Sequence, residues 1–78
     1  MKYITERITI DENLMDGKPT IRGMRITVQT ILEFLSAGDS AEEILSQYPS
    51  LEKEDINECI KFAAMLMGNN YSITELSA

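Results

Sequence analysis

The stretch SAEEILSQYP, residues 40–49, is the clearest structural signal in this sequence. Ser40 followed three positions later by Glu43 is a capping-box pattern, in which each side chain binds the backbone N–H of the other residue at the start of a helix. Apolar residues follow at helical spacing, and Pro49 ends the helix because proline has no backbone N–H to continue it. The stretch therefore predicts a short helix over 41–48.

Two further helices are predicted on either side of this one. Thr27 can cap a helix over 28–37, and Gly38 is well placed to end it. A longer helix is predicted over 53–67, where apolar residues again recur at helical spacing. Three helices with short connections are typical of the helix-turn-helix plan, so residues 28–68 are expected to form a helix-turn-helix-like three-helix domain.

The first part of the chain, residues 1–27, is predicted to be an N-terminal β arm. Apolar and polar residues alternate over 3–10 and again over 20–26, which is typical of two short strands. An isolated two-stranded ribbon is barely stable in water, so we expect these strands to pair across a homodimer. The fold class is thus mainly α, with a three-helix bundle, a two-stranded β arm and a C-terminal tail over 69–78. The residues expected to be structural are Ile21, Ile26, Ile31, Leu35, Ile44, Ile56 and Ile60.

The charge is distributed unevenly along the chain. The whole chain has a net charge of −6, but residues 1–27 carry five basic and four acidic side chains, a net charge of +1, while residues 28–78 carry −7. We therefore expect the arm to meet any anionic partner. The candidate contacts are Lys18, Arg22 and Arg25.

Catalysis is not expected, because the chain has no histidine, the commonest general base. The single cysteine, Cys59, falls on the predicted inward face of its helix and is expected to be a core residue. No catalytic residue, metal site or cofactor is predicted, although a small enzyme using carboxylates and a metal ion remains an alternative. A lone cysteine and the lack of a run of about 20 apolar residues predict a cytoplasmic protein that does not bind membranes.

Several segments resemble a known family. They are Ile8-Thr9-Ile10-Asp11, the run from Gly17 to Val28, Ala37-Gly38-Asp39-Ser40, Tyr48-Pro49-Ser50-Leu51 and Ala63-Ala64. With these segments the chain resembles the domain of unknown function 433 family from residue 8 to about 66. The resemblance implies a VapB-like antitoxin of the helix-turn-helix type, often encoded beside a PIN-like ribonuclease toxin. It also implies that residues 53–67 form the recognition helix. Met24 departs from the family pattern, which usually has threonine there.

The residues themselves argue against a DNA-contacting helix over 53–67. Its expected outward face is mainly acidic, while affinity for DNA comes largely from basic side chains that neutralise phosphates. That face consists of Lys53, Glu54, Asp55, Glu58 and Lys61. A paired β ribbon carrying Arg22 and Arg25 is the better candidate for operator DNA. Lys18 belongs to the same set of contacts, with Lys2 and Arg7 in support. The alternative is that the two arginines of the ribbon form ion pairs with Asp11, Asp16 or the acidic helices.

The same arginines suit a PIN-like toxin, whose clustered carboxylates hold a divalent metal ion. An inserted arginine could pair with these carboxylates and exclude the metal. An apolar contact surface is the other possibility, although the preferred interpretation is that its residues close the core or a dimer. Its candidates are Phe62, Met65, Leu66, Met67, Tyr71, Ile73 and Leu76. The sequence thus predicts an antitoxin that binds a nuclease and represses its own operon. The alternative is a protein–protein interaction module without DNA binding.

Overall fold

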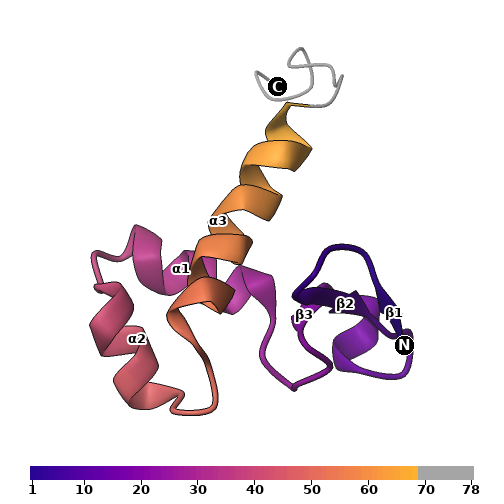
Figure 1. Ribbon diagram of the computed structural model, residues 1–78, viewed down its shortest axis with the longest axis horizontal. Helices are drawn as coiled ribbons and strands as arrows, with labels where there is room; N and C mark the ends of the chain where they lie inside the picture. Colours follow the sequence, from indigo (N-terminus) through magenta and orange to yellow (C-terminus); the bar gives the residue numbers. More distant parts are fainter. Residues whose placement is uncertain (69–78) are drawn as a thin grey trace.

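The computed structural model describes residues 1–68, which form a small antiparallel sheet followed by three α-helices (Figure 1). The elements in chain order are β1 (Lys2–Tyr3), β2 (Ile8–Ile10), the 3₁₀ turn η1 (Met15–Gly17), β3 (Thr20–Ile21), α1 (Val28–Ser36), α2 (Ala41–Gln47) and α3 (Lys53–Met67). The predicted tail over 69–78, with Tyr71, Ile73 and Leu76, lies outside the described residues.

The helix boundaries follow local capping chemistry closely. The Thr27 hydroxyl accepts a hydrogen bond from the Thr30 N–H at 3.0 Å, which confirms the predicted start of α1. At the start of α2, the Ser40 N–H donates to the Glu43 carboxylate at 2.8 Å and the Glu43 N–H donates to the Ser40 hydroxyl at 3.1 Å. This reciprocal pair is the predicted capping box, and such a box satisfies two backbone donors that the helix cannot.

The sheet differs from the predicted arm in having three strands. β2 lies in the middle and pairs antiparallel with β1 on one side and β3 on the other. The prediction of two strands was therefore wrong, and the strands find their partners within the chain instead of across a dimer. The predicted strand over 20–26 is also shorter than expected, because a turn at Arg22 and Gly23, both with positive φ, interrupts it.

The alternation expected over residues 3–10 is broken at Thr9. Ile8 and Thr9 are both fully buried, whereas Ile4 is 38% exposed. The Thr9 hydroxyl lies 2.9 Å from that of Thr20, directly opposite on β3, and accepts the Gly23 N–H at 2.8 Å. Because the two hydroxyls bind one another and the turn, both faces of β2 can be buried at low cost.

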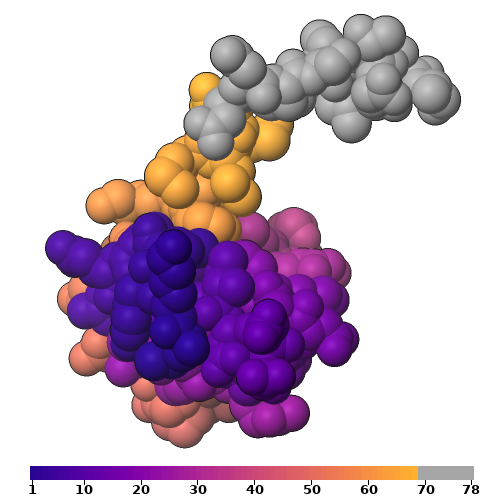
Figure 2. Space-filling view, turned by 90° about the vertical axis from the view of Figure 1, so that its right-hand side faces the viewer, coloured from indigo at the N-terminus to yellow at the C-terminus, as the bar shows by residue number. Residues whose placement is uncertain are grey.

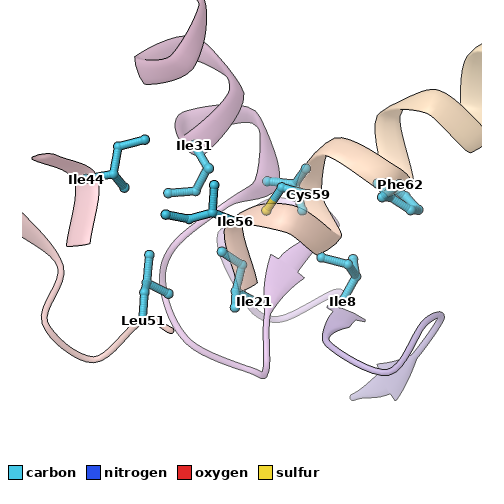
Figure 3. Close-up of a cluster of buried hydrophobic side chains, with 9 residues drawn as sticks. Ile8, Ile21, Ile31, Ile44, Leu51, Ile56, Cys59 and Phe62 are labelled. Carbon is cyan, nitrogen blue, oxygen red and sulfur yellow. The ribbon is translucent and has the colours of Figure 1, made fainter. Parts of the chain in front are cut away.

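The hydrophobic core lies where the three helices meet β2 and β3 (Figure 3). Ile56, on α3, points among Ile31 from α1, Ile44 from α2 and Leu51 from the α2–α3 connection. The buried apolar residues are Ile8, Ile21, Val28, Ile31, Ile44, Leu51, Ile56, Cys59 and Phe62.

Ile60 contradicts its predicted structural role, since 47% of it is exposed. It lies one residue beyond Cys59, and this turns its side chain about 100° away from the buried face of the helix. Phe62 is 8% exposed and belongs to the core, which confirms the preferred interpretation that it closes the core and excludes it from an exposed contact surface. Within residues 1–68, no helix has the length and apolar character needed to cross a membrane.

Candidate functional site

The carboxylate of Asp55 is completely buried and accepts four hydrogen bonds. The Arg22 guanidinium donates to it with two nitrogens, Nε to Oδ1 at 3.0 Å and Nη2 to Oδ2 at 2.7 Å. Arg7 donates a third hydrogen bond from Nη1 to Oδ1 at 2.9 Å. The fourth comes from the Glu52 backbone N–H, which lies 2.7 Å from Oδ2 and is one of the free donors at the start of α3. Asp55 therefore joins the helix start to the sheet.

The backbone of the sheet holds the two arginines side by side. Arg7 directly precedes β2 and Arg22 directly follows β3, and the Arg22 N–H donates to the Arg7 carbonyl at 2.9 Å. Arg22 and Gly23 have φ values of 48° and 73°, and the Met24 N–H donates to the Ile21 carbonyl at 2.8 Å. Two consecutive positive φ angles make this a tight turn in which an arginine adopts a conformation unusual for a residue with a side chain. The ion pair with Asp55 offsets part of that cost.

The surroundings of Asp55 favour its ionised form. Burial acts to raise the pKa of Asp55, but the hydrogen bonds from Arg22, the Glu52 N–H and Arg7 outweigh it and hold the pKa below 3.8. Hydrogen bonding to Asp55 likewise raises the pKa of Arg22, and Glu52 and Asp55 together raise that of Arg7. All three groups therefore remain charged at neutral pH.

This cluster changes the interpretation of Arg22. From the sequence, Arg22 is expected on a binding face and Asp55 on the outward face of its helix. The expectation for Asp55 is wrong, because its side chain is completely buried. The structure instead shows the alternative considered for Arg22, an ion pair with an acidic helix. Asp55 stands immediately before Ile56 and four residues before Cys59, on the buried face of α3, and this spacing is the signal that could have revealed it.

Lys18 and Arg25 are placed differently, because both are exposed and neither forms an ion pair with any residue in 1–68. Together they line an open polar cleft of about 470 Å³ beside the start of α1. Three carboxylates share this cleft, those of Glu12, Asp16 and Glu33. The cleft thus brings together two of the three predicted contact residues without an excess of positive charge.

A second hollow, of about 430 Å³, is an apolar groove between α1 and α3. Its apolar walls are formed by Pro19, Val28, Leu32, Phe62, Ala63 and Leu66. The last turns of α3 extend beyond the body of the molecule (Figures 1 and 2). Their apolar side chains are among the most exposed, with Met65 at 51%, Leu66 at 50% and Met67 at 64%.

Comparison with known proteins gives a family for this chain. The family described as "Protein of unknown function (DUF433)" matches residues 8–63. The chain belongs to the DUF433 family. The curated protein "Uncharacterized protein y4eO" of Sinorhizobium fredii (strain NBRC 101917 / NGR234) is 35% identical over 51 residues, which are 65% of this chain. The chain spans only 23% of that relative's length. No solved structure matches the chain.

The DUF433 match covers both halves of the cluster formed by Arg22 and Asp55, but it ends at Ala63, before the exposed end of α3. Met24, which departs from the threonine expected from the family resemblance, packs against the core. The side chain at this position therefore contributes apolar contact in place of a polar group beside the turn.

Proposed function

We propose that this protein is the antitoxin of a type II toxin–antitoxin pair, and that it acts in the cytoplasm as a binding protein without catalytic activity. Its partner would be a PIN-like ribonuclease toxin, as the resemblance to the DUF433 antitoxins implies. The exposed end of α3 is the observation that carries the proposal. Met65 and Met67 are more than half exposed on a helix that stands out from the body (Figure 2). Exposed methionines adapt readily to the shape of a protein partner.

Arg25 supplies a chemical means of inhibition. A PIN-like nuclease holds its divalent metal with clustered carboxylates, and a guanidinium can bind a carboxylate through two parallel hydrogen bonds. Arg25 is exposed and has no ion-pair partner within residues 1–68, whereas Arg22 is bound to Asp55. Insertion of Arg25 among the toxin's carboxylates would compete with the metal ion that the nuclease requires.

The test is to search the neighbouring genes for a PIN-like nuclease and to co-express that nuclease with this chain. We expect the native chain to restore growth and to co-purify with the nuclease. Met65→Asp should weaken co-purification at least tenfold, because a buried unpaired charge is costly at an apolar contact. Arg25→Ala should leave binding largely intact but release nuclease activity on an RNA substrate.

Glu54→Gln is the matched control, because Glu54 is exposed on the same helix and forms no ion pair with residues 1–68. It should behave as the native chain in both assays. A gene neighbourhood without a PIN-like nuclease, or a nuclease that neither binds this chain nor is inhibited by it, would overturn the proposal.

Operon repression through DNA binding is the second candidate, and it rests on two exposed cations in the polar cleft, which three carboxylates also line. Lys18 and Arg25 lie exposed in one cleft beside the start of α1, so both can reach phosphates. The outward face of α3 is acidic, and DNA phosphates would repel Glu54 and Glu58. This argues against α3 as the recognition helix of a helix-turn-helix. The DNA-binding form of this proposal therefore depends on the cleft and not on α3.

Filter binding to the upstream operator at several salt concentrations tests this second candidate. If Arg25 contacts phosphate, Arg25→Ala should weaken binding and reduce the slope of log affinity against log salt by about 1 per bound copy. Lys61→Ala, which removes a cation from α3, should change neither. Binding that stays at non-specific levels and is insensitive to Arg25→Ala would leave the alternative, a protein–protein interaction module without DNA binding.

A further inference from the structure

The buried face of α3 continues past the part of the molecule that covers it. Ile56, Cys59 and Phe62 follow one another along this face and are at most 8% exposed. Leu66 is the next residue on the same face, four positions after Phe62, and half of it is exposed. This face of the helix is therefore apolar along its length but covered only over its first part.

The uncovered part of this face forms one wall of the apolar groove, and α1 forms the other. Lys18 and Glu33 stand at the rim of the groove. Neither side chain forms an ion pair with another residue in the described part of the chain, 1–68. The groove thus combines an apolar floor with one exposed positive and one exposed negative charge.

These charges limit what can occupy the groove. With a net charge of −6, two copies of this chain repel one another over most of their surfaces. The residues of α3 that line the groove, Phe62, Ala63 and Leu66, are uncharged, so contact there avoids this repulsion. In a twofold-symmetric contact each rim meets the same rim of the other copy, and one cation with one anion is then self-complementary.

We propose that a second copy of this chain fills the groove, through a twofold contact in which the two α3 helices cross. Leu66 of each copy packs against Val28 and Leu32 of the other, and Lys18 of each copy faces the partner's Glu33. The proposal is independent of the antitoxin function and places the expected homodimer on the helices in place of the β arm. A chain of 78 residues with only nine buried apolar side chains among residues 1–68 gains most from such added burial.

Sedimentation equilibrium of the full chain tests the proposal. The native chain should sediment at about twice its mass of 8.8 kDa at micromolar concentration. Leu66→Glu should weaken self-association at least tenfold, because it places a charge in an apolar contact. Met65→Glu is the matched control, since Met65 is exposed to the same degree but does not line the groove. Circular dichroism should be unchanged in both variants, because neither side chain belongs to the core.

A charge exchange tests the rim contact separately. Lys18→Glu and Glu33→Lys should each weaken self-association, because each places like charges opposite one another at both rims. The double variant Lys18→Glu/Glu33→Lys should restore it. A native chain that remains monomeric throughout, or equal weakening by Leu66→Glu and Met65→Glu, would overturn the proposal. Failure of toxin binding would not overturn the dimer proposal, because the toxin assays use Met65 and Arg25, which lie outside the groove.

Discussion

Asp55→Asn is expected to destabilise the protein by about 3 kcal/mol, a large part of the stability of so small a domain. The asparagine has nearly the same shape, but it loses the negative charge that Arg7 and Arg22 both face. Its amide NH₂ group must also point at one of the existing donors. Since the two arginines are only 27% and 33% exposed, water replaces the lost partner incompletely. Urea denaturation at pH 7 measures the loss.

Glu54→Gln is the control for this substitution. It removes a neighbouring carboxylate that is exposed and unpaired within residues 1–68, so its cost in stability should stay below about 0.5 kcal/mol.

Acid titration gives a second, independent readout of the contribution of Asp55 to stability. The pKa of Asp55 in the folded protein lies below its ordinary value of 3.8. The ionised carboxylate therefore contributes fully to folding stability above pH 3.8, and this contribution is lost as the pH falls through the lower pKa of the folded state.

The native chain should therefore lose stability steeply below about pH 4, and Asp55→Asn should remove part of that loss. An Asp55→Asn variant as stable as Glu54→Gln would show that the ion-pair cluster does not join the sheet to α3. If Asp55→Asn lost as much stability at low pH as the native chain does, the lowered pKa of Asp55 would be contradicted.

Ile56→Ala is expected to destabilise the protein by about 3 kcal/mol, because it opens a cavity among Ile31, Ile44 and Leu51 (Figure 3). Ile56 is 1% exposed and lies where all three helices meet, so few neighbouring side chains can move into the space. The melting temperature and the urea midpoint should both fall.

Ile60→Ala makes the same chemical change one helical turn further along α3, and it provides the comparison. Ile60 is 47% exposed, so the expected cost is below about 1 kcal/mol. Sequence periodicity alone assigned both isoleucines to the core. Equal losses from the two substitutions would show that the surface of α3 at Ile60 is covered in solution, in conflict with the structure.

Local capping chemistry in the sequence was enough to place α1 and α2, and apolar spacing was enough to place α3. Thr27, the Ser40–Glu43 capping box and Gly38 each act on backbone groups within a few residues, so their effect does not depend on the rest of the fold. The same holds for the charge difference between residues 1–27 and 28–78, which is a property of composition. The family resemblance was also present in the sequence, and the match over residues 8–63 confirms membership of the family.

The pairing of charges, by contrast, was decided only by the tertiary structure. Arg7, Arg22 and Asp55 are separated by up to 48 residues, and no local pattern tells which acid an arginine will meet. The same is true of Thr9, whose burial depends on the Thr20 hydroxyl across the sheet. Helical spacing predicts which face of α3 is buried, but it does not predict over what length of the helix the rest of the molecule covers that face. Leu66 is therefore exposed while Phe62 is buried, because coverage depends on where α1 and the sheet end in space.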